Sequence, residues 1–124
     1  MSKPLADRAV LVVEDDYFIA DEMRRALEDG GARVLGPVGD VEDALALIVG
    51  AARIDAAVLD VNLHDGTVSP VADALAERGV PFVFTTGYDR AALPERHAAV
   101  RRLEKPVAPS AVLREVGRLL GAAD

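Results

Sequence analysis

The chain has 124 residues, about half of them hydrophobic, and a formal net charge of −7. This length suits one domain with its own core, residues 1–124, and the negative charge argues against nucleic acid as a partner. Cysteine is absent, which excludes disulfides and cysteine-ligated zinc. No stretch approaches the roughly 18 apolar residues of a membrane helix, and MSKPLADR lacks a signal-peptide core, so we expect a cytoplasmic protein without membrane contact.

The first predicted element is a buried strand over Ala9–Val13, an unbroken apolar run that ends abruptly in three adjacent carboxylates. The next segment, YFIADEMRRALEDGG, carries apolar side chains at helical spacing, and its two terminal glycines stop the helix. The segment ARVLGPVGD then predicts a short strand closed by glycine and proline.

A helix and a second buried strand follow. VEDALALIVG predicts a helix with Asp40 as its N-cap and Gly50 at its end. DAAVLDVNL contains another all-apolar strand, which ends in the carboxylate of Asp60. SPVADALAERG predicts a helix that tolerates Pro70 in its first turn.

The last third of the chain contains two more predicted strands and a closing helix. PFVFTTG predicts a strand that begins with proline, and AVRRLEKP predicts a weaker one. Between them, YDRAALPERHAAV has Pro94 where a fourth helix is expected, so that helix should be short or irregular. The closing helix lies in PSAVLREVGRLLGAAD, and its buried side should include Val112, Val116, Leu119 and Leu120.

This alternation of buried strands and helices predicts an α/β fold, in which helices cover both faces of a parallel sheet. In such folds, ligands bind at the carboxyl ends of the strands, near the point where the strand order reverses. Several polar residues are predicted to meet at that edge: Glu14, Asp15, Asp16, Asp60, Thr85, Thr86 and Lys105.

These residue types together indicate phosphoryl chemistry. Clustered carboxylates are tolerated when they hold a cation, and oxygen ligands suit Mg²⁺. A lysine and a hydroxyl suit a phosphoryl group, so the predicted product is an aspartyl phosphate. Each signal alone has a commonplace explanation, because carboxylates after strands often cap helices and Lys-Pro and Thr-Gly pairs are frequent in loops. Their joint occurrence at four strand ends favours a site.

The segments VLVVEDD, AAVLDVNL, FVFTTGY and LEKP resemble a receiver domain of two-component response regulators, and the resemblance covers essentially the whole chain. It implies a five-stranded, doubly wound, flavodoxin-like parallel sheet of strand order 2-1-3-4-5. It also implies a Mg²⁺-dependent, phosphorylation-controlled role in signal transduction.

By this resemblance, Asp60 matches the phosphoacceptor of the family. Glu14 and Asp15 match the acidic pair of the metal site, with Asp15 as the more direct Mg²⁺ ligand. Asp60 is a further ligand, and Asn62 matches the position whose backbone carbonyl binds the metal.

The remaining matched positions would contact the phosphoryl group. Thr86 matches the hydroxyl that contacts it, and Lys105 matches the lysine that bridges it to the first-strand acid. The family resemblance also implies a cis bond before Pro106. Because side chains alternate along a strand, Thr85 should point away from Thr86 and serve the structure, and Asp16 should be a cap or a minor outer group.

The chain departs from ordinary receivers at the position of their aromatic switch residue, where it has Arg102. Tyr88 follows the Thr-Gly pair instead, which resembles the FAT GUY receivers of general stress signalling, with Thr85 in place of their alanine. Tyr88 is either the replacement switch or a loop aromatic that covers the site. We expect His64 to be a solvated loop residue and not a metal ligand, and we expect no partner for His97.

The resemblance implies that a histidine kinase or histidine phosphotransfer protein supplies the phosphoryl group. We expect a monomer or weak dimer with no output domain after the last helix. Output would then come from a protein partner bound through the last helix and last strand, or the chain would act as a phosphate shuttle or sink. An acidic partner would suit a basic patch on this side of the chain: Arg96, Arg101, Arg102 and Arg118.

Three other functions are compatible with parts of this sequence. The first is a receiver that acts as a binding module without phosphorylation, against which the complete set of acid, threonine and lysine argues. The second is a phosphatase with an aspartyl nucleophile, but Asn62 stands where a second acid is usual, so we expect no enzyme beyond self-catalysed phosphotransfer and dephosphorylation. The third, a nucleotide-binding module, lacks a glycine-rich loop after the first strand.

Overall fold

The computed structural model describes residues 3–87 and 93–121. Its elements, in chain order, are β1 (Ala9–Val13), α1 (Tyr17–Asp29), β2 (Arg33–Val38), α2 (Val41–Gly50), β3 (Ala56–Asp60), β4 (Asn62–Leu63), β5 (Gly66–Thr67), α3 (Ser69–Glu77), β6 (Phe82–Thr86), the 3₁₀ turn η1 (Glu95–His97), β7 (Arg102–Glu104) and α4 (Pro109–Leu119). None of the helices in the described ranges is long and apolar enough to cross a membrane.

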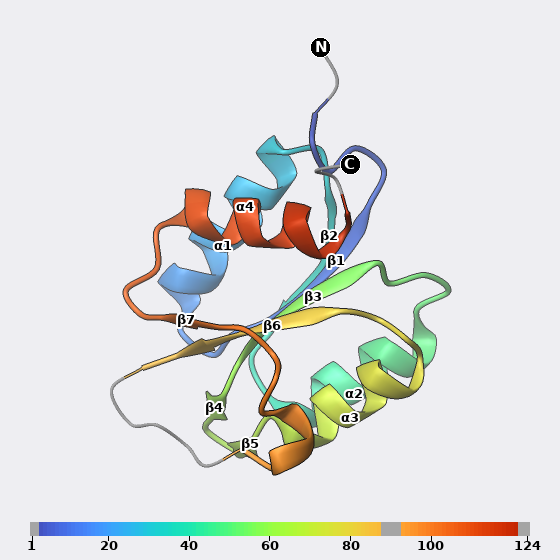
Figure 1. The fold of residues 1–124 in the computed structure, drawn as a ribbon, viewed down its shortest axis with the longest axis vertical. Helices are drawn as coiled ribbons and strands as arrows, with labels where there is room; N and C mark the ends of the chain where they lie inside the picture. The colour runs from blue at the N-terminus through green and yellow to red at the C-terminus, as the bar shows by residue number, and fades with distance from the viewer. Residues whose placement is uncertain (1–2, 88–92, 122–124) are drawn as a thin grey trace.

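Five parallel strands form the main sheet in the order β2-β1-β3-β6-β7, with helices on both faces (Figure 1). This confirms the predicted doubly wound sheet, since β6 and β7 are the fourth and fifth strands of the expected 2-1-3-4-5 order. A small antiparallel ribbon, β4 with β5, lies between β3 and α3 in the chain and was not predicted.

The two faces of the sheet carry separate cores. Helices α2 and α3 pack on one face and α1 and α4 on the other, as Figure 1 shows. Along β1, Leu11 and Val13 belong to the α2/α3 core, whereas Val10 and Val12 belong to the α1/α4 core. Because strand side chains alternate, an all-apolar strand is what a sheet covered on both faces requires.

The helix ends follow the predicted local signals. Asp16 caps α1, because its Oδ1 accepts hydrogen bonds from the backbone nitrogens of Phe18 and Ile19 at 3.0 and 3.1 Å. Asp40 caps α2 in the same way, and α2 ends at Gly50 as predicted. These caps satisfy amide groups that a helix start leaves without partners.

The fourth helix is reduced, as predicted from Pro94. Among the residues described between β6 and β7, the only helical element is η1, a single 3₁₀ turn that begins directly after this proline. In the closing helix, Val112 and Val116 are buried, whereas Leu119 and Leu120 are half-buried. The peptide bond before Pro106 is cis, as expected, and so is the bond between Gly36 and Pro37.

Candidate functional site

The carboxyl ends of the central strands bring the predicted acids to one edge of the sheet. β1 pairs with β3 so that Val13 lies opposite Leu59, and the next residues along these strands are Glu14 and Asp60. Alternation places these two carboxylates on the α1/α4 face, because Val13 and Leu59 belong to the opposite core. Both acids are buried, with exposed fractions of 3% and 4%.

Lys105 reaches this acid pair from β7, at the edge of the sheet. Its Nζ lies 2.8 Å from Glu14 Oε1 and 3.1 Å from Asp60 Oδ2. The contact with Asp60 is a hydrogen bond, and the contact with Glu14 Oε1 is an ion pair. The backbone nitrogen of Lys105 donates to the carbonyl of Thr86 at 2.7 Å, which ties the ends of β6 and β7 together.

A third carboxylate completes the cluster. One oxygen each of Glu14, Asp15 and Asp60 lies within 4.8 Å of the other two, and Asp15 is exposed at the mouth of the site. Three oxygen donors at this separation, with one side open for water, fit Mg²⁺, which keeps several waters when it binds to protein carboxylates. Asn62 follows at the start of β4, and its backbone nitrogen donates to Asp60 Oδ1 at 3.3 Å.

Burial makes the negative charge of this cluster costly. It is the main cause that raises the pKa of Glu14 from 4.5 to about 7, in spite of the opposing effect of Lys105. Burial likewise raises the pKa of Asp60 above its usual value. Burial disfavours the charged form of Lys105, but the neighbouring carboxylates outweigh this effect and raise its pKa. When both buried acids are ionised, Lys105 balances only one of the two negative charges, so a bound cation would be stabilised here.

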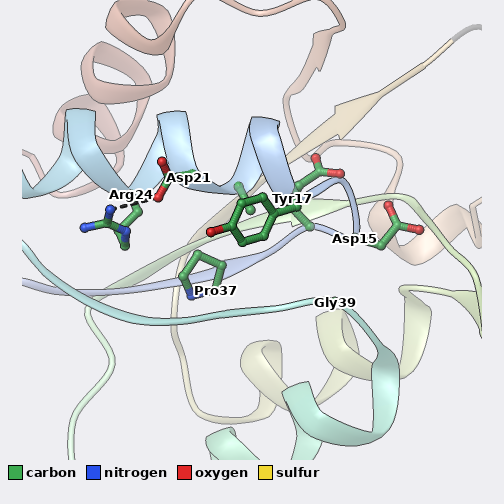
Figure 2. A pocket seen from close by; sticks show the side chains of 8 residues that line it. Asp15, Tyr17, Asp21, Arg24, Pro37 and Gly39 are labelled. Carbon is green, nitrogen blue, oxygen red and sulfur yellow. Dashed lines mark hydrogen bonds and ion pairs between the residues drawn. The ribbon is translucent and has the colours of Figure 1, made fainter.

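A cleft of about 460 Å³ opens beside the cluster, between α1 and the end of β2 with the residue that follows it. Figure 2 shows Tyr17 and Arg24 of α1 on one side of this cleft and Pro37 and Gly39 on the other. The carboxylates of Glu14 and Asp15 form part of its lining, so a cation or a reacting group can approach the acids from solvent.

Comparison with known proteins assigns the family. No protein-family model and no curated protein sequence matches the chain, but solved structures do. SdrG from Sphingomonas melonis Fr1 is 38% identical over 94% of this chain and 98% of its own, with a TM-score of 0.78. The BeF3-activated conformation of SdrG from Pseudomonas melonis Fr1 is 40% identical over 93% and 98%, with a TM-score of 0.73. A CheY-like response regulator receiver domain protein from Methanospirillum hungatei JF-1 is 26% identical over 94% and 95%, with a TM-score of 0.80.

This chain belongs to the response regulator receiver domains. Its five-stranded sheet is the sheet of that family, and a role in response-regulator signalling follows from the membership. Of the predicted site residues, the receiver fold brings Glu14, Asp15, Asp60 and Lys105 together.

The two threonines of β6 lie next to this group. Thr86 ends the strand and is buried, and strand alternation gives it the same side as Phe84. Thr85 is completely buried and lies opposite Asp60 in the β3–β6 pairing. The predicted opposite orientation of the two side chains is therefore consistent with the register of this receiver.

The prediction for His97 was wrong. The residue is buried, and its Nε2 lies 2.8 Å from Asp73 Oδ1 on α3. Arg96 donates two further hydrogen bonds of 2.7 Å to the same carboxylate, and these are the main cause that lowers the pKa of Asp73 to about 2. Asp73 thus fastens η1 to α3, a contact between residues 24 positions apart that no local pattern signals. His64, by contrast, is an exposed residue, as predicted, with Nδ1 4.0 Å from Asp15.

The predicted basic patch is largely neutralised within the chain. Arg101 and Arg118 both bind the carboxylate of Glu115 on α4, at 3.0 and 2.6 Å, and Arg96 is engaged by Asp73. Arg102 is exposed on the edge strand β7, as expected for a residue that cannot replace a buried aromatic switch. Tyr88, the alternative candidate for the switch, lies outside the described residues.

Proposed function

We propose that this receiver accepts a phosphoryl group on Asp60 from a histidine kinase or histidine phosphotransfer protein, with Mg²⁺ as its cofactor. The observation that carries the proposal is the contact between a buried Asp60 and Lys105 within a cluster of three acids. A lone buried aspartate would be a cost to the fold, whereas an aspartate beside a lysine and a cation site is prepared for phosphoryl transfer. No observation favours a receiver that works without phosphorylation.

The transfer itself needs few groups from the protein. An Asp60 carboxylate oxygen attacks the phosphorus of a phosphohistidine, the new P–O bond forms, and the P–N bond breaks as the imidazole leaves. Lys105 can follow the developing charge, since its ammonium already lies 3.1 Å from Asp60. When bound by Glu14, Asp15, Asp60 and the carbonyl of Asn62, Mg²⁺ would supply positive charge against the phosphoryl oxygens. We assign Thr86 as the hydroxyl that contacts the phosphoryl group from the end of β6.

In this proposal the chain is a phosphoacceptor in signalling and not an enzyme that acts on a separate substrate. Support comes from SdrG, which has a BeF3-activated conformation and is 40% identical to this chain. Beryllium fluoride on a carboxylate resembles a phosphoryl group in shape and charge. We place the exchange in the cytoplasm, and we assign the chain to the FAT GUY group on the segment FVFTTGY.

The output would pass through contacts with a protein partner. α4 and β7 are suited to this role because the backbone of Lys105 joins the end of β7 to β6, next to Asp60. A change at the phosphoacceptor can therefore reach the surface formed by these two elements. Beryllium fluoride should shift amide signals of residues 102–119 in the wild type and should leave them unchanged in Asp60→Asn.

Labelling with a small phosphodonor, such as phosphoramidate, tests the proposal without knowledge of the kinase. Wild-type protein with Mg²⁺ should gain one base-labile phosphoryl group, and chelation of the metal should prevent this. Asp60→Asn should remain unlabelled, whereas Asp29→Asn is the control, because Asp29 is exposed at the far end of α1. Labelling of Asp60→Asn at the wild-type level would refute the assignment.

A further inference from the structure

Thr85 places a hydroxyl group in the protein interior, where polar groups normally form hydrogen bonds. The residue is completely buried in β6, and its Oγ1 has no hydrogen-bond partner among the described residues. Valine has nearly the same shape and would fill this position without leaving a polar group unsatisfied. A buried hydroxyl that costs stability in the free protein suggests a partner in another state.

The strand register places this hydroxyl beside the phosphoacceptor. Thr85 lies opposite Asp60 on β3 and opposite Leu103 on β7. Val83 and Leu103 both belong to the α1/α4 core, so Thr85, two residues after Val83, points to that same face. Asp60, two residues after Val58, does so as well. Neighbouring strands lie about 4.8 Å apart, which makes Thr85 the adjacent side chain to Asp60 on this face.

The same strand register determines the path of the Lys105 side chain across the sheet. Lys105 follows Leu103 by two residues, and its ammonium reaches Asp60 and Glu14, one and two strands beyond β6. The lysine side chain must therefore cross β6 near Thr85. In the unphosphorylated protein, Asp60 Oδ2 accepts a hydrogen bond from Lys105, and Oδ1 accepts one from the backbone nitrogen of Asn62.

We propose that Thr85 is a positioning residue of the phosphorylated state, whose hydroxyl donates a hydrogen bond to the Asp60 oxygen that Lys105 releases. This inference rests on the proposed function. When a phosphoryl group is attached, Lys105 turns toward the new negative oxygens, and the Asp60 oxygen loses its donor. Thr85 then gains its first partner and holds the acyl group in place. Thr86, the last residue of β6, contacts the phosphoryl group itself in the proposed function, so the two threonines bind different parts of the phosphorylated aspartate.

The test compares Thr85→Val with Thr85→Ser, because the first removes only the hydroxyl and the second keeps it. Beryllium fluoride, with saturating Mg²⁺, is the probe for binding, and thermal unfolding without it measures packing. We expect Thr85→Val to melt at or above the wild-type temperature yet to bind the probe roughly fivefold more weakly. Thr85→Ser should melt lower, because a methyl group is lost from the core, but should bind like the wild type.

Each outcome decides a different claim. Wild-type affinity in Thr85→Val, or equal losses in both variants, would overturn the role of Thr85 and leave the phosphoacceptor intact. If the wild type does not bind the probe, or if Asp60→Asn binds it equally well, the proposed function fails and this inference fails with it.

Discussion

The buried carboxyl group of Glu14 should make the metal-free receiver more stable in mild acid than at neutral pH. Its pKa is 4.5 when solvated and about 7 in the fold, chiefly because burial penalises the charge. Since the folded pKa is the higher one, the folded state binds the proton more tightly. The group therefore favours folding at low pH, and this contribution is lost as the pH rises from about 4.5 to 7.

The magnitude follows from the size of this pKa difference. A shift of 2.5 units, from 4.5 to about 7, corresponds to about 3 kcal/mol in the free energy of unfolding. A chain of 124 residues has an unfolding entropy near 0.26 kcal/mol/K, so the melting temperature should fall by about 10 °C between pH 5 and pH 7.5. The raised pKa of Asp60 acts in the same direction. Asp55 and Asp73 have lowered pKa values and remain ionised throughout this range.

Thermal unfolding of the wild type and Glu14→Gln, followed by circular dichroism at both pH values, measures the effect. Glutamine keeps the shape and an acceptor for the backbone nitrogen of Asp16 but cannot ionise. The variant should lose most of the pH dependence and should melt above the wild type at pH 7.5. Subtracting the pH dependence of Glu14→Gln from that of the wild type removes the contribution of every titrating group except Glu14 and the groups in contact with it.

Magnesium provides the second half of the test. At tenfold its dissociation constant, a ligand that binds only the folded state adds about 1.4 kcal/mol, or about 5 °C here. This gain should appear in the wild type at pH 7.5 and should shrink in Glu14→Gln and in Asp15→Ala. The reasoning is refuted if the wild type melts no higher at pH 5 than at pH 7.5, or if Glu14→Gln shows the same slope.

Two further predictions concern the scaffold. Asp73→Asn removes the charged acceptor of buried His97 and should lower the free energy of unfolding by about 1 kcal/mol, measured by urea unfolding. The control is Glu77→Gln at an exposed position of the same helix, which should have little effect. Equal urea midpoints for the two variants would contradict the link between η1 and α3. Gly36→Ala should lower the free energy of unfolding by about 2 kcal/mol or more, because φ is +88° and a Cβ would lie 2.8 Å from a backbone nitrogen. The control is Gly50→Ala, whose Cβ would meet nothing within 4 Å and which should be neutral or stabilising. An unchanged urea midpoint for Gly36→Ala would contradict this prediction.

The sequence alone was sufficient for the order and type of the main elements. Buried strands on a doubly covered sheet are apolar at every position, and Ala9–Val13 shows this without any knowledge of the fold. Helix ends depend on a residue's own neighbours, so Asp40 and Gly50 could be assigned from local chemistry. Pro94 predicted the reduction of the fourth helix, because proline cannot continue a helical hydrogen-bond pattern. The acids at strand ends were predicted to meet because parallel strands share one carboxyl edge.

The tertiary structure decided which side chains touch. The register of β3 with β6 put Thr85 beside Asp60, and nothing in either segment states that register. The partner of His97 is Asp73 on α3, which lies 24 positions earlier in the chain, so no local pattern around His97 indicates the contact. The arginines of the expected basic patch were likewise neutralised by Glu115, whose burial depends on how α4 packs. Local patterns report the period and the ends of an element, whereas pairing between distant side chains depends on how the elements are packed against one another.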